Sequence, residues 1–160
     1  MRVTKWGEYG ILCSLFLTHK YKLGCSAGAS EIAKSQDIPL QYTQQILQRL
    51  RKGDVIESIR GPLGGYKLAR APEDISIKDV LYAAEGNTFE VMCETNPVCG
   101  INGDRADCCG LRDVWRDLKA TIDDVLAKKT LASVFENHDL SLQFDDKSEL
   151  VGIAQSKETS

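Results

Sequence analysis

The amino-acid sequence predicts a mostly α-helical chain with one small β-hairpin, and three stretches support this prediction. Residues 29–52 have the pattern of two short helices joined by a turn. Residues 55–69 have the pattern of a hairpin around a turn rich in Gly and Pro. Residues 111–127 have apolar side chains at helical spacing on one face. A helix-turn-helix followed by a hairpin is a winged helix, so we predict a winged helix-turn-helix with a long helix appended.

The first predicted helix spans residues 4–19, with Thr4 as its N-cap. Its apolar residues recur at helical spacing, and Cys13 lies among them. A buried free thiol behaves as a small hydrophobic group, so we expect Cys13 to pack in the core. Glu8 falls away from the centre of this apolar stripe and is expected to be exposed.

Two short helices are expected next, at about residues 29–35 and 40–52, separated by a turn at residues 36–39. The second helix is expected to direct four apolar side chains inward: Leu40, Ile46, Leu47 and Leu50. Its polar sides carry Gln41, Tyr42, Gln44, Gln45, Gln48, Arg49 and Arg51. Gln can pair with adenine and Arg with guanine, which suits a DNA-recognition helix. The alternative is that these polar residues form the exposed side of an ordinary helical hairpin that does not bind DNA.

The hairpin favours the first of these two interpretations. Its strands are expected at residues 55–59 and 66–69, and Arg60 lies at the wing tip, where it can reach a phosphate or a minor groove. Residues 41–70 contain six basic and two acidic side chains, a net charge of +4 in a chain of net charge −3. A basic segment in an acidic protein is a signal of nucleic-acid binding. The predicted DNA contacts are Gln41, Tyr42, Gln44, Gln45, Arg49, Arg51 and Arg60.

A further helix is expected from residue 75 or 76 to residue 85, and a polar segment with four cysteines follows. Cys93, Cys99, Cys108 and Cys109 lie among Asn, Gly, Asp and Pro residues, which favour turns and supply no core. Such thiols indicate metal ligation, a disulfide or redox chemistry. The chain shows no signal peptide and no membrane-length apolar run, so we expect a cytoplasmic protein, in which structural disulfides are rare.

The long helix at residues 111–127 has a strongly apolar face. The members of this face recur every three or four residues: Leu111, Val114, Trp115, Leu118, Ile122, Val125 and Leu126. Such a helix outside a small winged domain suggests a dimer interface, with packing inside the monomer as the alternative. A short helix at residues 131–135 is expected next, and the last fifteen or so residues are expected to form a poorly ordered tail.

Several stretches of the sequence resemble one family, the winged-helix iron–sulfur regulators. This family is typified by IscR, a regulator of iron–sulfur cluster biogenesis, and NsrR, a nitric-oxide sensor. The matching stretches are residues 1–5, 42–52, 60–68, 75–80 and 111–118, within a resemblance that covers about residues 1–135. The resemblance implies a homodimer that binds double-stranded DNA. It also implies that the long dimerisation helices cross, with an iron–sulfur cluster near the dimer interface.

The resemblance implies a set of cluster ligands as well. Cys93, Cys99 and Cys109 match the three loop cysteines of the family. Glu8 occupies the place of an acidic ligand that the partner's N-terminal helix supplies in some branches, and Cys108 is the competing fourth ligand. We expect a 2Fe–2S cluster, with a 4Fe–4S cluster as the alternative.

The chain departs from the family's pattern in two places. The interval between Cys99 and the third cysteine is longer than usual, and Arg112 stands where the biogenesis regulators have a histidine ligand. Arg is always protonated and is a poor metal ligand, so the fourth ligand must come from elsewhere. Thiolates suit zinc as well as iron, but structural zinc sites usually space their cysteines more closely than Cys93 and Cys99.

With this resemblance the chain divides into four parts. These are a winged-helix DNA-binding domain (1–86), a cysteine-rich cluster-binding loop (87–110), a dimerisation helix with a short docking helix (111–136) and a disordered tail (137–160). The predicted function is a dimeric transcriptional regulator that senses iron–sulfur status, or redox or nitrosative stress, through its cluster. The alternatives are a metal-free regulator with a thiol–disulfide switch and a small electron-transfer protein. No motif of the sequence indicates an enzyme.

Overall fold

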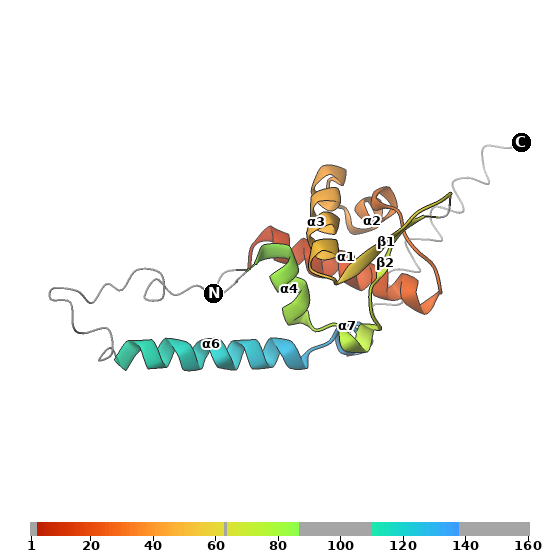
Figure 1. Cartoon of the computed structure of the whole chain (residues 1–160). Helices are drawn as coiled ribbons and strands as arrows, with labels where there is room; N and C mark the ends of the chain where they lie inside the picture. Colours follow the sequence, from red (N-terminus) through yellow and green to blue (C-terminus); the bar gives the residue numbers. More distant parts are fainter. Residues whose placement is uncertain (1–2, 63, 87–109, 138–160) are drawn as a thin grey trace, which may run out of the picture.

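The computed structural model describes residues 3–62, 64–86 and 110–137, in which helices pack together and one antiparallel hairpin projects beside them (Figure 1). The elements are α1 (Lys5–Lys22), α2 (Ala29–Gln36), α3 (Leu40–Lys52), β1 (Ile56–Ile59), β2 (Gly65–Leu68), η1 (Pro72–Asp74), α4 (Ile77–Glu85), α6 (Gly110–Lys128) and α7 (Leu131–Asn137). The predicted winged helix-turn-helix with a long appended helix is confirmed. None of the helices described here is long and apolar enough to span a membrane.

Helix α1 runs through the centre of the winged domain. Residues 13–19 are all buried, so this part of the helix is covered on every side, and it contacts α2, α3, α4, α7 and β2. Two buried hydroxyl groups are satisfied inside the helix. Ser14 Oγ donates to Gly10 O at 2.8 Å, and Thr18 Oγ1 donates to Ser14 O at 2.9 Å. The predicted burial of Cys13 is confirmed, because its side chain is 0% exposed.

Helices α2 and α3 form the helix-turn-helix. Helix α2 ends at Asp37, whose left-handed φ of 54° reverses the chain direction before α3 begins. The buried stripe of α3 consists of Thr43, Ile46, Leu47 and Leu50. The prediction that Leu40 points inward is wrong, since Leu40 is 43% exposed. It is the first residue of α3 and lies a turn before the stripe meets the core, where Thr43 takes the inward position.

Strands β1 and β2 form the wing, with Ile56 opposite Leu68. Ala27 adds a bridge to this hairpin, in a segment whose Gly- and Ser-rich sequence predicts only a loop. Ala27 N donates to Tyr66 O at 3.0 Å, and Tyr66 N donates to Ala27 O at 2.8 Å. A Cβ atom at Gly65 would collide with Ala27 O, so glycine is what permits this close approach.

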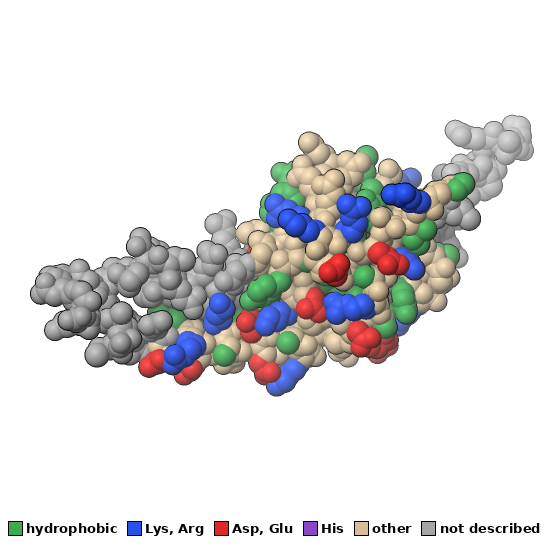
Figure 2. Space-filling model, viewed as in Figure 1, with side chains coloured by type: hydrophobic (Ala, Val, Ile, Leu, Met, Phe, Trp, Pro, Cys, Tyr) green, Lys and Arg blue, Asp and Glu red, His purple; other side chains and the backbone are tan. Residues whose placement is uncertain are grey.

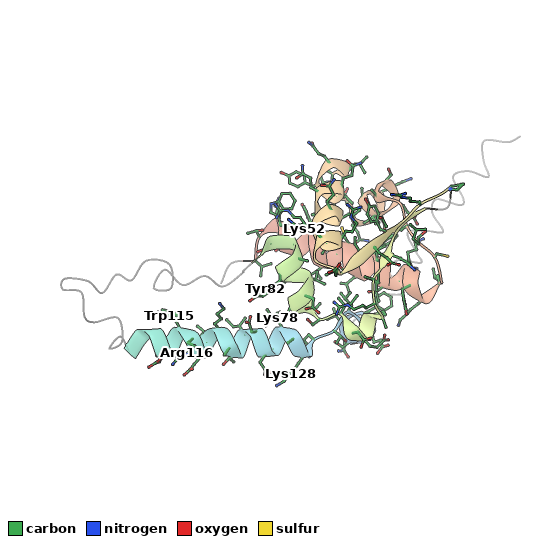
Figure 3. All side chains as sticks on the ribbon, viewed as in Figure 1. Lys52, Lys78, Tyr82, Trp115, Arg116 and Lys128 are labelled. Carbon is green, nitrogen blue, oxygen red and sulfur yellow. The ribbon has the colours of Figure 1, made fainter. Side chains whose placement is uncertain are left out.

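Helix α4 lies between the winged core and α6. It begins with a capping box, in which Asp79 N donates to Ser76 Oγ and Ser76 N donates to Asp79 Oδ2, both at 3.1 Å. On its other side, Lys78 and Tyr82 face α6 (Figure 3). Lys78 Nζ lies 3.2 Å from Asp123 Oδ2, and the Tyr82 hydroxyl lies 3.4 Å from both Asp123 carboxylate oxygens. Asp123 therefore fastens α6 to α4.

Helix α6 leaves the winged domain as an arm (Figure 1). Its C-terminal half docks through Asp123 and Leu126, and α7 then packs back onto the core with Leu131 and Phe135 buried. Four large apolar side chains of α6 are exposed: Val114, Trp115, Leu118 and Val125. Both predicted C-terminal helices are confirmed, whereas residues 138–160, expected to form the tail, lie outside the described residues.

Candidate nucleic-acid interface and cluster ligands

The solvent-facing side of α3 holds the side chains predicted to contact bases. Gln41, Gln44 and Gln45 are exposed, and Tyr42 is 49% exposed with its ring packed on Trp6 at a centroid distance of 5.5 Å. The buried stripe lies on the opposite side of α3, so these groups point away from the core. Amide and hydroxyl groups on the outer face of a helix are suited to base edges in a major groove.

The wing projects beside the α2–α3 pair (Figure 1). Arg60 directly follows β1 and is exposed at the start of the turn. Gly64 N donates to Gly61 O at 2.9 Å and closes this turn. Arg60 is therefore an exposed residue at the tip of a projecting hairpin, the place that the sequence predicts.

Part of the positive charge of residues 41–70 is paired within the described structure. Lys67 Nζ lies 2.8 Å from Glu57 Oε1, and Arg70 Nη2 lies 3.7 Å from Asp79 Oδ2. Four basic side chains of this segment have no acidic partner among the residues described: Arg49, Arg51, Lys52 and Arg60. Figure 2 shows Lys and Arg side chains along α3 and the hairpin, and Figure 3 places Lys52 at the end of α3 nearest α1.

Arg49 differs from the other predicted DNA contacts. Its Nη1 atom donates to Ala84 O, near the C-terminal end of α4, at 2.7 Å. The guanidinium carbon also lies 4.3 Å from the centre of the Trp6 ring. The Arg49 guanidinium is therefore held at the junction of α1, α3 and α4.

The part that Glu85 plays at the same junction is not predicted from the sequence. One carboxylate oxygen, Oε1, accepts hydrogen bonds from Thr4 N at 2.7 Å, Thr4 Oγ1 at 2.9 Å and Gly7 N at 2.7 Å. Backbone N–H groups in the first turn of a helix have no partner inside the helix, and Glu85 supplies one. A Cβ atom at Gly7 would collide with this oxygen. A glycine in the first turn of α1 is the sequence signal that could have indicated the close approach.

Of the five candidate cluster ligands, four lie outside the described residues: Cys93, Cys99, Cys108 and Cys109. Glu8 is described and lies in the first turn of α1. It is exposed as predicted, and its carboxylate makes no hydrogen bond or ion pair to another described residue. The described part of the chain holds no group of three or more His, Cys, Asp or Glu residues arranged for a metal ion. Glu8 is thus an exposed carboxylate without a partner among the described residues.

A family model described as Rrf2, iron-dependent transcriptional regulators, matches residues 3–137, from before α1 to the end of α7. The chain belongs to the Rrf2 family. The match includes α3, the hairpin and residues 93–109, which contain four cysteines, and it confirms the resemblance stated from the sequence. It also shows that the chain is a transcriptional regulator.

Curated relatives and solved structures are similar to this chain over most of its length. The transcriptional regulator IscR of Sodalis glossinidius is 33% identical over 140 residues, which are 88% of this chain and 82% of that protein. The structure of T. potens IscR has a TM-score of 0.65 and 27% identity, covering 86% of this chain and 88% of that one. CymR, the global cysteine regulator of B. subtilis, has a TM-score of 0.68 over 86% of this chain and 98% of its own. Its identity of 23% supports the shared fold alone.

The two described cysteines are expected to differ in reactivity. Burial raises the pKa of the Cys13 thiol to about 12, so that it stays protonated, whereas Cys25 is exposed. Because the thiolate is the reactive form, iodoacetamide at about pH 8 should modify Cys25 and spare Cys13 in the folded protein. Mass mapping checks this, since Lys20 and Lys22 place the two cysteines on separate tryptic peptides. Denaturant should make Cys13 reactive, and equal reaction of both in the folded protein would contradict the burial.

Proposed function

We propose that this Rrf2-family chain is a cytoplasmic, dimeric DNA-binding regulator that responds to iron–sulfur status, or to redox or nitrosative stress, through an iron–sulfur cluster. The observation behind its DNA-binding role is the exposed polar face of α3 beside a projecting wing, in a chain that belongs to a family of transcriptional regulators. Relatives named IscR and four cysteines within residues 93–109 support the cluster.

In this proposal α3 enters the major groove of double-stranded DNA. Tyr42 and the glutamines of the outer face, Gln41, Gln44 and Gln45, lie against base edges. Arg51 and Arg60, both exposed and without acidic partners in the described structure, contact the backbone or a minor groove. Phosphate contacts position the domain, and base contacts give its sequence preference.

The partner that covers the apolar face of α6 is a second copy of the chain. Val114, Trp115, Leu118 and Val125 are exposed in the single chain, and contact between two copies would remove them from water. A symmetric dimer also presents two recognition helices, which suits an operator with two half-sites. Helix α6 is therefore the proposed dimerisation helix.

The proposed cluster ligands are Cys93, Cys99 and Cys109 of one chain and Glu8 of the partner subunit. When bound, an iron–sulfur cluster supplies a centre whose oxidation state and stability depend on its ligands and exposure. Glu8 lies on α1, which contacts both α3 and α4. A ligand bond at Glu8 would therefore act on the helix that supports the recognition helix. We favour a 2Fe–2S cluster, with 4Fe–4S as the alternative.

Substitutions in the wing and in α3 should have different effects on DNA binding. Arg60→Ala should weaken binding to all duplexes and reduce the salt slope by about 1, since a phosphate contact is lost. Gln44→Ala should instead change base preference at one position by about 1–3 kcal/mol. Fluorescence anisotropy over a salt series, with a duplex selected by the wild-type chain, measures both effects. An unchanged affinity and slope for Arg60→Ala would show that the wing does not contact DNA.

A charge in the apolar face of α6 should prevent dimerisation. Trp115→Asp should yield monomers that lose tight binding to a two-site duplex, because burying an unpaired carboxylate costs several kcal/mol. Sedimentation velocity gives the oligomeric state. Lys128→Asp, a charge change at the far end of the same helix, is the matched control and should remain dimeric. A Trp115→Asp variant that sediments as the wild-type dimer would place the interface elsewhere.

The ligand set can be tested by substituting its members one at a time. Cys93→Ala, Cys99→Ala and Cys109→Ala should each abolish the visible absorption of the anaerobically reconstituted protein. Cys108→Ala should largely spare it, because consecutive side chains diverge in most backbone conformations and do not easily share one site. Glu8→Ala should retain some cluster in a labile form, since water can replace one oxygen ligand.

Absorption and circular dichroism spectra, followed over time in air, distinguish these outcomes. A colourless Cys108→Ala variant beside a fully stable Glu8→Ala variant would make Cys108 the fourth ligand. Loss of colour in none of the three single Cys variants would count against the cluster itself.

A further inference from the structure

Arg49, on α3, donates a hydrogen bond to a carbonyl group at the C-terminal end of α4. The last four carbonyl groups of a helix have no partner inside it, and Ala84 O is one of them. Arg49 Nη1 donates to this oxygen at 2.7 Å. A cation at this end of a helix also interacts favourably with the helix dipole. The contact thus ties α3, through Arg49, to the last turn of α4.

The next residue of α4 ties α1 to the same place. Glu85 Oε1 accepts three hydrogen bonds from Thr4 and Gly7, at 2.7–2.9 Å, at the start of α1. Ala84 and Glu85 are adjacent, so one turn of α4 holds both the recognition helix and the N-terminus of the central helix. The relative placement of α1 and α3 depends on this turn.

Trp6 extends this arrangement to the outer face of α3. Its ring lies 4.3 Å from the Arg49 guanidinium and packs on Tyr42 at 5.5 Å. Tyr42 and Arg49 are seven residues apart, two helical turns, so they lie on the same side of α3. Trp6 therefore packs along that side, and its position depends on Arg49 at one end and affects Tyr42 at the other.

We propose that Arg49 is a positioning residue for DNA recognition, which orients α3 and the Trp6–Tyr42 pair rather than contacting DNA. This inference rests on the proposed DNA-binding function and gives Arg49 a role different from the direct contact predicted from the sequence. The two roles differ in a measurable quantity. A guanidinium that neutralises a phosphate adds about one counterion to the salt dependence of binding, and a positioning guanidinium adds none.

The test compares Arg49→Met with Arg51→Met in the full chain. Arg51 is the matched control, because it lies two residues further along α3 and, like Arg49, is exposed without an acidic partner among the described residues. The two differ in that Arg49 donates a hydrogen bond to Ala84 O, whereas the Arg51 guanidinium donates none to a described residue. The probes are a duplex enriched by the wild-type chain from a random library and a scrambled duplex of the same composition. Anisotropy titrations over a salt series give the affinity and the salt slope for each.

Arg49→Met should lower affinity for the enriched duplex roughly tenfold, as expected for a lost charged hydrogen bond, with the scrambled duplex and both salt slopes unchanged. Arg51→Met should weaken binding to both duplexes and reduce the slope by about 1. Arg49→Lys keeps a cation near Ala84 O and Trp6, so it should recover part of the lost affinity even if Arg49→Met is less stable.

A double-mutant comparison tests whether Arg49 acts through Trp6. Trp6→Leu should lower affinity for the enriched duplex, and adding Arg49→Met should cause little further loss, because both changes disrupt one contact. Additive losses would overturn the proposed route through Trp6.

If Arg49→Met lowers the affinity for both duplexes equally and also reduces the salt slope, Arg49 is a direct phosphate contact. Unchanged affinity for both duplexes would show that Arg49 has no role in recognition. Either result would overturn the proposal about Arg49 and leave DNA binding by α3 intact. Failure of the wild-type chain to enrich any duplex would instead contradict the proposed function.

Discussion

The burial of residues 13–19 of α1 on every side is the constraint on which the rest of the structure depends. This covered part of the helix has no face for polar side chains, so its two buried hydroxyl groups, Ser14 and Thr18, donate to carbonyl oxygens one turn back. Four apolar residues of this part of α1 belong to the hydrophobic core: Cys13, Leu15, Phe16 and Leu17. Helix α1 contacts five other elements: α2, α3, α4, α7 and β2. Because each of them packs on α1, its surface determines where they lie in the winged domain.

The elements of this fold could be predicted where their signals are local. The Thr4 cap, the turn at Asp37 and the apolar periodicity of α3 and α6 each lie within a few residues of the structure that they specify. The predictions are wrong or incomplete where tertiary packing determines the position of a residue. Leu40 continues an apolar pattern but precedes the place where α3 meets the core, and Ala27 pairs with Tyr66 from a segment without strand character.

The sequence predicts which residues of the candidate interface are exposed. It predicts less well which of its basic side chains are paired. Counting the charges of residues 41–70 treats all six basic side chains as equal, although Lys67 and Arg70 are paired with Glu57 and Asp79. Arg49 is held by an oxygen of Ala84, thirty-five positions along the chain. Such contacts depend on how α3 packs against α4, for which a single sequence contains no local signal. The basic residues left without acidic partners in the described structure lie at the end of α3 and at the wing tip.

Helix α4 connects the two halves of the proposed regulator. One side of it packs on α1 and α3, and its last turn is tied to both through Glu85 and Ala84. On its other side, Lys78 and Tyr82 fasten Asp123 of α6. If α6 pairs with a second copy of itself, the distance between two recognition helices is set by the angle between α6 and α3. That angle is determined by short contacts on the two sides of a single nine-residue helix. A small rotation of α4 would therefore displace the recognition helices relative to the dimer axis, because α6 extends as an arm from one side while α3 packs on the other.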